Sequence, residues 1–394
     1  MRRLSALTLV AACTLFSGWF WQGGTLVQMF DSIDHHIATQ FPDNPNAWHL
    51  ASLRRVYQQP PSTWPAPQRD PDAVAADLAP WQRDSPQAAA AVVSTFSTTP
   101  TIAQVELGQR LFNDPILSAS GQISCQSCHH PELGWGDGLS RSVGHNRTQG
   151  KRNAPPLFNA VHQRSLGWDG SASSLAAQLR NAMTHPAEMG VQTPDDIVRR
   201  LEQHADYRQR FTQIYGPAPI ASSQLDDALI AFLGTLERPT TLDHFLAGDS
   251  TRLSDQQVWG MHLFRTKARC INCHAGPLLS DQGFHNLGLS FFLQASEDLG
   301  RYQATDNPED AGRFRTPSLR HLAQTAPYMH NGVFRDLRGV VNFYTQGGGE
   351  TRVRNDQEAA HPLYVYAARK SALLKPVALS AEEIDALTAF LQAL

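Results

Sequence analysis

The chain has 394 residues, which is enough for two or three domains with their own hydrophobic cores. Hydrophobic residues make up 41% of it and its formal net charge is −3, so it lacks the basic excess that nucleic-acid binding requires. Five cysteines are present, and because four of them fall in two short motifs described below, we expect no disulfide framework.

The first 22 residues resemble a targeting segment. Met1-Arg2-Arg3 is positively charged, and the mostly apolar run Leu4–Trp21 that follows is typical of a secretory signal. We therefore expect export to the periplasm, with residues 1–22 acting as a signal peptide or a membrane anchor. Cys13 follows Val10-Ala11-Ala12, which is similar to a lipoprotein processing box. It is either a lipid attachment site or an apolar residue of the signal.

Residues 23–100 are expected to form an N-terminal extension that is partly extended and that lies on or tethers the following domains. Ala88–Val93 is predicted to form a short helix, and His35 and His36 are interpreted as surface residues rather than ligands. The extension is interrupted by residues that break helices and favour extended chain, namely Pro60, Pro61, Pro65, Pro67 and Pro71.

Helical periodicity begins near Thr101, and a similar element begins with the capping box Ser254–Gln257. Both elements contain the pattern G-x-x-L-F, at Gly108–Phe112 and Gly260–Phe264, which is a weak internal repeat. The start, stop and periodicity signals predict further helices at Ser173–Met183, Thr193–Tyr215, Ser222–Glu237 and Ser380–Leu391. Alternating strand patterns are scarce, so the predicted fold class is mainly α.

Two copies of the pattern C-x-x-C-H follow the two G-x-x-L-F elements. This pattern is the attachment signal of c-type haem, in which two thiols form thioethers and the histidine ligates the iron. A zinc ribbon also pairs C-x-x-C units, but at spacings of roughly 15–20 residues, whereas these pairs lie 145 residues apart. We predict two covalent haems, one in a domain at residues 101–250 and one at 251–394. The haem-binding residues are Cys125, Cys128 and His129, and Cys270, Cys273 and His274.

Residues 100–394 resemble the bacterial di-haem cytochrome c peroxidase superfamily, which includes the maturation enzyme MauG. The resemblance implies that the first haem binds peroxide and that the second transfers electrons. It is carried, beside the two haem motifs, by Gly144-His145, Asn153-Ala154-Pro155, Trp168-Asp169-Gly170, Pro186-Ala187-Glu188-Met189-Gly190, Arg315-Thr316-Pro317-Ser318-Leu319-Arg320 and Ala326-Pro327-Tyr328-Met329-His330-Asn331-Gly332.

The resemblance also implies roles for three residues near the first haem. Glu188 would be the acid/base, since cleavage of the O–O bond needs a group that takes a proton from one oxygen and returns it to the other. His145 would cap the peroxidatic iron at rest and leave on activation. Trp168 would lie between the haems, where an aromatic side chain can carry an electron and also fill the core.

Two further metal assignments follow from the same resemblance. Asn153 and the backbone carbonyls of Thr325 and Pro327 match a calcium site, and oxygen donors suit this hard cation. The sixth ligand of the second haem is either Met329 or Tyr344, and the alignment favours Tyr344, which MauG shares. A thioether favours ferrous iron, whereas an anionic phenolate favours the higher oxidation states.

We therefore expect a periplasmic di-haem peroxidase that reduces hydrogen peroxide to water. A small periplasmic cytochrome c or copper protein would donate the electrons, and the family suggests a homodimer. One alternative is MauG-like oxidation of Trp or Tyr side chains of a partner protein, and another is a di-haem electron carrier without catalysis. The carrier would have two fully ligated irons and no reaction with peroxide.

Overall fold

The structure is a computed structural model of the chain and describes residues 45–81 and 99–394. In these ranges no helix is long and apolar enough to cross a membrane. Some predictions lie outside the described residues, namely the targeting segment 1–22 with Cys13, the surface positions of His35 and His36, and the helix at Ala88–Val93.

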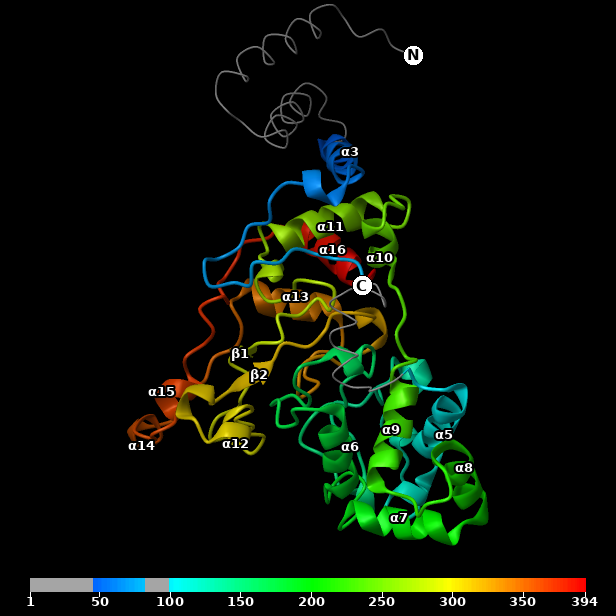
Figure 1. The fold of residues 1–394 in the computed structure, drawn as a ribbon. Helices are drawn as coiled ribbons and strands as arrows, with labels where there is room; N and C mark the ends of the chain where they lie inside the picture. Colours follow the sequence, from blue (N-terminus) through cyan, green and yellow to red (C-terminus); the bar gives the residue numbers. More distant parts are fainter. Residues whose placement is uncertain (1–44, 82–98) are drawn as a thin grey trace, which may run out of the picture.

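The described residues are mostly helical, which confirms the predicted fold class. Figure 1 shows two helical lobes, one with α5 to α9 and the other with α10, α11, α13 and α16. The strands β1 (Phe284–Asn286) and β2 (Arg313–Arg315) form a short antiparallel pair. The helices are α3 (Pro45–Tyr57), α5 (Ile102–Asn113), α6 (Leu175–Thr184), α7 (Pro194–Gln203), α8 (Ala205–Tyr215), α9 (Ser222–Leu233), α10 (Thr241–Leu246), α11 (Asp255–Arg265), α12 (Tyr302–Thr305), α13 (Leu337–Thr345), α14 (Asp356–Ala359), α15 (Tyr364–Ala367) and α16 (Ala381–Leu391).

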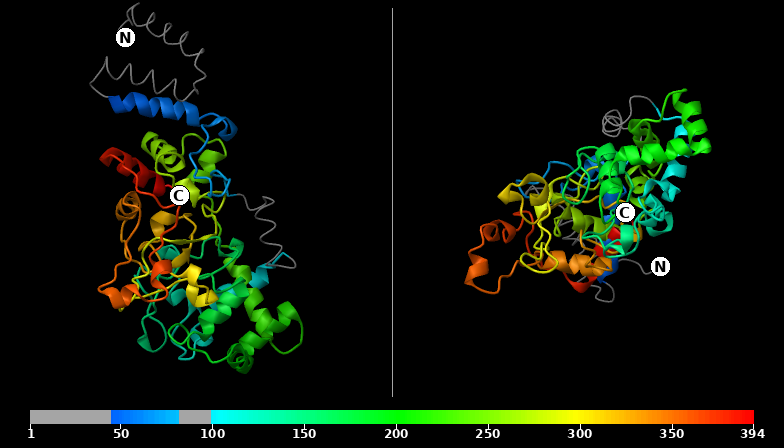
Figure 2. Two further views of the ribbon diagram at one scale, coloured as in Figure 1. Left: turned by 90° about the vertical axis from the view of Figure 1, so that its left-hand side faces the viewer. Right: turned by 90° about the horizontal axis from the view of Figure 1, so that it is seen from below.

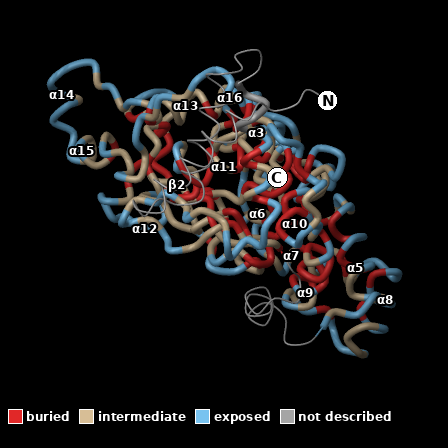
Figure 3. Tube along the Cα trace, turned by 90° about the horizontal axis from the view of Figure 1, so that it is seen from above, coloured by how far each residue is buried: buried red, intermediate tan, exposed pale blue. Residues whose placement is uncertain are grey.

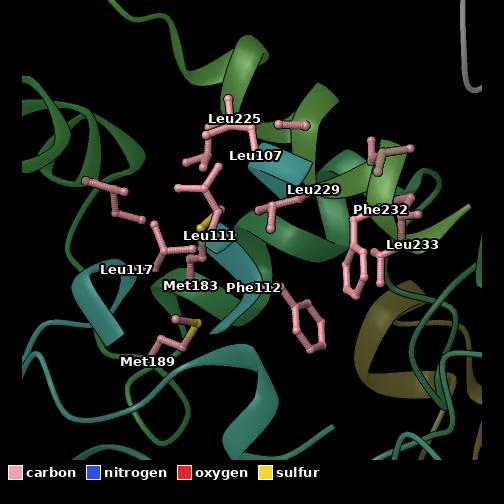
Figure 4. Packing of buried hydrophobic residues seen from close by; sticks show 14 of the residues in the cluster. Leu107, Leu111, Phe112, Leu117, Met183, Met189, Leu225, Leu229, Phe232 and Leu233 are labelled. Carbon is pink, nitrogen blue, oxygen red and sulfur yellow. The ribbon is translucent and has the colours of Figure 1, made fainter. Parts of the chain in front are cut away.

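The core of the first lobe is built where α5 crosses α9. Thr101 caps α5 in a capping box, and the helix begins near Thr101 as the periodicity predicts. Gly108 permits a very close crossing, because a Cβ atom added there would lie 1.8 Å from the carbonyl oxygen of Ala228. Figure 4 shows the apolar side chains that fill this core around Leu111 and Phe112.

The second lobe repeats this crossing with α11 and α16. The capping box predicted at Ser254 is confirmed, and Ser380 caps α16 in the same way. An added Cβ atom on Gly260 would lie 2.0 Å from the carbonyl oxygen of Ala386. The weak repeat G-x-x-L-F therefore has a shared physical cause, since in each lobe its glycine lies where the helix before a haem motif crosses another helix.

The described part of the N-terminal extension packs on the second lobe. Helix α3 lies against α11 in the views of Figures 1 and 2. The buried side chain of Arg265 on α11 donates hydrogen bonds to Asp77, to the Tyr57 hydroxyl at 3.0 Å and to the Pro65 carbonyl at 3.0 Å. One cation thus ties three points of residues 45–81 to this helix.

Two of the predicted helices have different bounds. The helix predicted at Thr193–Tyr215 is wrong, because His204 takes an extended conformation (ψ 113°) and separates α7 from α8. Leu201 at the end of α7 and Tyr207 on α8 are both buried, and a spacing of six residues does not place them on one face of a single helix. Helix α9 ends at Leu233, earlier than the predicted Glu237.

Buried residues run through both lobes, as Figure 3 shows. The segment that carries α14 is mostly exposed. Trp168 on the first lobe and His330 on the second are both buried, with ring centroids 6.4 Å apart. The two lobes therefore meet around Trp168.

Candidate haem sites

The two C-x-x-C-H motifs have the same local structure. Each begins with a 3-10 turn, η3 (Cys125–Ser127) or η7 (Cys270–Asn272), and the backbone N–H of the histidine donates to the carbonyl of the first cysteine at 2.9 Å. None of these four cysteines is in a disulfide bond. Burial raises the pKa of the Cys125 and Cys270 thiols to about 12. This turn brings two thiols and an imidazole close together in each lobe.

The histidines of both motifs have one ring nitrogen occupied by a backbone hydrogen bond. The Nδ1 atom of His129 is 2.9 Å from the carbonyl oxygen of Trp135, and that of His274 is 3.0 Å from the carbonyl oxygen of Leu279. Because a carbonyl only accepts, Nδ1 carries the proton and the Nε2 lone pair remains for a metal. Burial lowers the pKa of both imidazoles, which favours this neutral form.

A cavity of about 220 Å³ adjoins the second motif. Cys270, Cys273 and His274 line it, and most of its wall is apolar, from side chains such as Leu337 and Val341. None of the described residues that line it is acidic. Apart from His274, its basic side chains are Lys267, Arg269, His285, Arg315, His330 and Lys375. An apolar wall with cationic side chains fits a haem, which is a flat apolar ring with two anionic propionates.

Both candidates for the sixth ligand of the second haem line this cavity. Tyr344 extends from α13, and burial together with the nearby thiols of Cys273 and Cys270 raises the pKa of its hydroxyl. Met329 lies in a loop and has a positive φ of 73°. The structure therefore brings together the two side chains between which the sequence leaves a choice.

Glu188 and His145 are adjacent at the first motif. The backbone N–H of His145 donates to the carbonyl of Glu188 at 2.7 Å. The carboxylates of Asp137 and Glu188 are close enough to Cys128 that, after burial, they raise the pKa of its thiol, to about 11 in all. The predicted acid/base and the predicted distal ligand thus lie together beside the cysteines of the first motif.

The burial and the hydrogen bonding of the His145 and Glu188 side chains suit their predicted roles. The Nδ1 atom of His145 is buried and has no hydrogen-bond partner among the described residues, which is unusual for a polar atom outside a ligand site. The Glu188 side chain is 49% exposed, with His185 3.8 Å away. Packing of the surrounding protein raises the pKa of Glu188 and His185 opposes this, so the carboxyl is suited to exchange protons.

Trp168 joins the first lobe to the cavity of the second. Its indole N–H donates to the carbonyl of Asn153 at 2.9 Å, and its own carbonyl accepts from the backbone N–H of Arg315 at 2.8 Å. Trp168 also lines the cavity beside the second motif. A residue of the first lobe thus forms part of the cavity wall beside the second motif.

The residues predicted to bind calcium line the same cavity. Asn153 is 7% exposed, and its Nδ2 atom donates to the carbonyl of Leu139 at 2.8 Å, which directs the amide nitrogen away from any cation. Thr325 and Pro327 also line the cavity. The calcium site stays a prediction that rests on the family resemblance.

Sequence reasoning did not assign two charged residues of the second cavity. His285 is 2.8 Å from the Asp281 carboxylate, and this contact together with its position beside Cys273 raises its pKa to about 10 against the effect of burial. No sequence signal marks this pair as functional. Arg315 opens a motif that carries the family resemblance, but the motif alone gives it no role.

Comparison with known proteins places the chain in a class. The profile of the family described as di-haem cytochrome c peroxidase matches residues 102–251. The chain is 36% identical to the cytochrome-c peroxidase IdrP1 of Pseudomonas sp. (strain SCT), over 74% of this chain and 80% of that protein. It is 39% identical to the methylamine utilization protein MauG of Methylorubrum extorquens, over 63% of this chain and 70% of that protein.

Solved structures agree with this class. A MauG-like protein associated with microbial copper homeostasis superposes with a TM-score of 0.67 and 29% identity, over 83% of this chain and 95% of that chain. The diheme peroxidase BthA of Burkholderia thailandensis shares the fold with a TM-score of 0.63 and 23% identity, over 83% and 94%. The chain belongs to the di-haem cytochrome c peroxidase family. It is a peroxidase-type oxidoreductase with two haem cofactors.

Proposed function

We propose that this protein is a periplasmic peroxidase with two covalently attached c-type haems, which reduces hydrogen peroxide to water with electrons from a small redox protein. The observation that carries the proposal is the position of Glu188. Its carboxyl lies near Cys128 and its backbone carbonyl holds His145. An acid/base next to the thiols of one motif is what peroxide reduction needs.

Each motif would hold its haem through two thioethers and one histidine. Cys125 and Cys128 would attach the first haem, and His129 would ligate its iron through Nε2, since Nδ1 donates to the Trp135 carbonyl. Cys270, Cys273 and His274 would do the same for the second. When bound, the haems supply the iron that binds peroxide and the redox centres that store and pass electrons.

Residues around the first motif would transfer protons and control the access of peroxide to the first haem. Glu188 would accept the proton of the oxygen that binds and return it to the oxygen that leaves, and its raised pKa suits both transfers. His145 would occupy the distal position at rest, where its buried nitrogen lacks another partner. Its movement would open the site to peroxide.

Electrons would reach the first motif from the second lobe. Trp168 lies between the lobes and lines the second cavity, so its indole is suited to pass an electron. We expect the donor to be a small periplasmic cytochrome c or copper protein. A homodimer and a calcium ion at Asn153, Thr325 and Pro327 are part of the same proposal.

One alternative function is favoured by a specific observation. Tyr344 lines the second cavity, and a phenolate ligand stabilises oxidised iron. This supports oxidation of Trp or Tyr side chains of a partner protein, the MauG-like function. The third alternative, a di-haem electron carrier, does not explain the position of Glu188 near Cys128.

The test is to add one equivalent of hydrogen peroxide to the purified ferric protein and to follow visible and near-infrared absorption. Reaction only after half-reduction, followed by oxidation of a reduced cytochrome, supports the peroxidase. An immediate spectral change of both haems without reduction supports the alternative. No reaction in either state contradicts both and leaves the carrier.

A further inference from the structure

Arg315, the last residue of β2, is buried without an acidic partner. It is 5% exposed, and its guanidinium donates to two backbone carbonyls, from Nε to Gly167 at 3.1 Å and from Nη1 to Thr316 at 3.4 Å. No carboxylate of the described residues pairs with it. Burial alone lowers its pKa to about 10. Buried charges in proteins are almost always paired.

The other deeply buried arginines of the chain show the contrast. Arg265 pairs with Asp77, and Arg320 pairs with Asp243. Arg265 and Arg320 are each 1% exposed, so all three arginines are in comparable surroundings. Residues 45–81 and 99–394 provide a carboxylate for two of these arginines and none for the third.

The cavity beside Arg315 shows where its counter-ion would come from. The other cationic side chains that line this cavity already have carboxylate partners on the protein. Lys267 bonds to Glu383 at 2.7 Å, and Asp70 lies 3.5 Å from Arg269 and 3.0 Å from Lys375. His285 bonds to Asp281 at 2.8 Å. Among the described lysine and arginine residues that line the cavity, Arg315 is therefore the one without a carboxylate partner.

Arg315 also holds the loop that carries Trp168. Its Nε atom bonds to the carbonyl of Gly167 and its backbone N–H bonds to the carbonyl of Trp168. Arg315 thus lines the cavity beside the second motif, and its main chain holds the residue whose indole lies at the lobe boundary.

We propose that the Arg315 guanidinium binds a propionate of the second haem and, through Gly167 and Trp168, fixes the position of Trp168 relative to that haem. The inference rests on the proposed haem at Cys270 and Cys273. Arg315 is a positioning residue in this scheme. It neutralises one propionate, which raises the reduction potential of the second haem, and it sets the path for an electron through Trp168.

The test is a spectroelectrochemical titration of both haems in the purified holoprotein and in Arg315→Gln. Loss of the cation should lower the reduction equilibrium constant of the second haem by about tenfold, the size expected for a unit charge at an effective dielectric constant of about 20. This equals about 59 mV for a one-electron couple. The first haem should change much less.

Arg301→Gln is the matched control. The Arg301 guanidinium bonds to the carbonyls of Asp169 at 3.1 Å and Gly170 at 2.8 Å, so it holds the same loop, but it does not line the cavity. It should leave the second potential unchanged. An equal shift in Arg301→Gln and Arg315→Gln, or no shift in Arg315→Gln, would overturn the proposal.

Arg315→Lys keeps the charge. The reduction equilibrium constant of the second haem should therefore stay within about threefold of its value in the unmodified protein. If Arg315→Gln does not retain the second haem, this lysine variant decides. If Arg315→Lys retains the second haem with a nearly unchanged reduction potential, the proposal is supported. If Arg315→Lys also loses the second haem, the proposal is overturned. Peroxide turnover of the unmodified protein is measured separately, so that failure of the proposed function is distinguished from failure of this inference.

Discussion

The ring of His145 lies so close to Gly190 that a Cβ atom added to the glycine would be 2.6 Å from it. Gly190 also has a positive φ of 67°, which glycine adopts without strain. Two residues before it, the Glu188 carbonyl accepts the backbone N–H of His145. The loop 186–190 therefore fixes both the ring and the main chain of His145.

Gly190→Ala should displace the His145 ring. The added methyl group overlaps the ring, so we expect a changed distal ligation of the first haem, visible as a change of spin state in absorption and electron paramagnetic resonance spectra. Gly121→Ala is the control, because Gly121 has a similar φ of 64° with no atom near its added Cβ. Both should lose about 1–2 kcal/mol of stability from backbone strain. An unchanged first-haem spectrum in Gly190→Ala would contradict the role of His145.

Glu188→Gln should reduce peroxide turnover by about 10²–10⁴-fold, the usual contribution of an acid/base, while both haems stay attached. Because its surroundings raise the pKa of Glu188, the unmodified enzyme should lose activity on acidification above the ordinary carboxyl range, as the base becomes protonated. This acid limb should be absent from the residual activity of the variant. Glu132→Gln, an exposed glutamate of the same lobe, should retain full turnover.

Tyr344→Phe decides between the two candidate ligands of the second cavity. If the phenol oxygen ligates the iron, its removal should change the ferric spectrum and raise the reduction potential of the second haem, since an anionic oxygen favours oxidised iron. Met329→Leu should change neither. The opposite pattern, with an effect in Met329→Leu alone, would assign the methionine as the ligand.

Asp77→Asn should loosen the N-terminal extension. It removes the carboxylate partner of buried Arg265 and should cost about 2 kcal/mol, as for other hydrogen bonds between charged groups, measured by denaturant unfolding. The pKa of Asp77 is lowered in the folded state, mainly by Arg265 against the effect of burial. Its contribution is therefore complete above the ordinary aspartate pKa and is lost as the pH falls through the lowered value.

The control for this measurement is Asp72→Asn, because Asp72 is exposed in the same segment. Its stability and its pH profile should match those of the unmodified protein. Equal stability of the two variants would show that Arg265 does not depend on Asp77.

The haem motifs and the capping boxes could be predicted from sequence because they are local. The tight turn of C-x-x-C-H and the caps at Ser254 and Ser380 depend on residues within a few positions of one another. Glu188 and His145 were found through the resemblance, and the structure shows them in contact through the backbone.

Other features depend on contacts that no short pattern records. The carbonyls of Trp135 and Leu279, which orient the histidines of the two C-x-x-C-H motifs, come from irregular loops. The break at His204 follows from packing of α7 and α8 as separate helices, which a capping signal at Thr193 does not reveal. That no carboxylate of the described residues pairs with Arg315 can be seen only once its three-dimensional surroundings are known.

The attachment of Arg265 to Asp77, Tyr57 and Pro65 sets an order of assembly. Residues 45–81 are synthesised before either lobe, yet the helix α11 that receives them begins at Asp255. Contacts of such long sequence separation form slowly, because the intervening chain must first be brought together. The helices α5 and α9 of the first lobe both lie before α11 in the sequence. The first lobe can therefore fold before residues 45–81 have α11 to pack against.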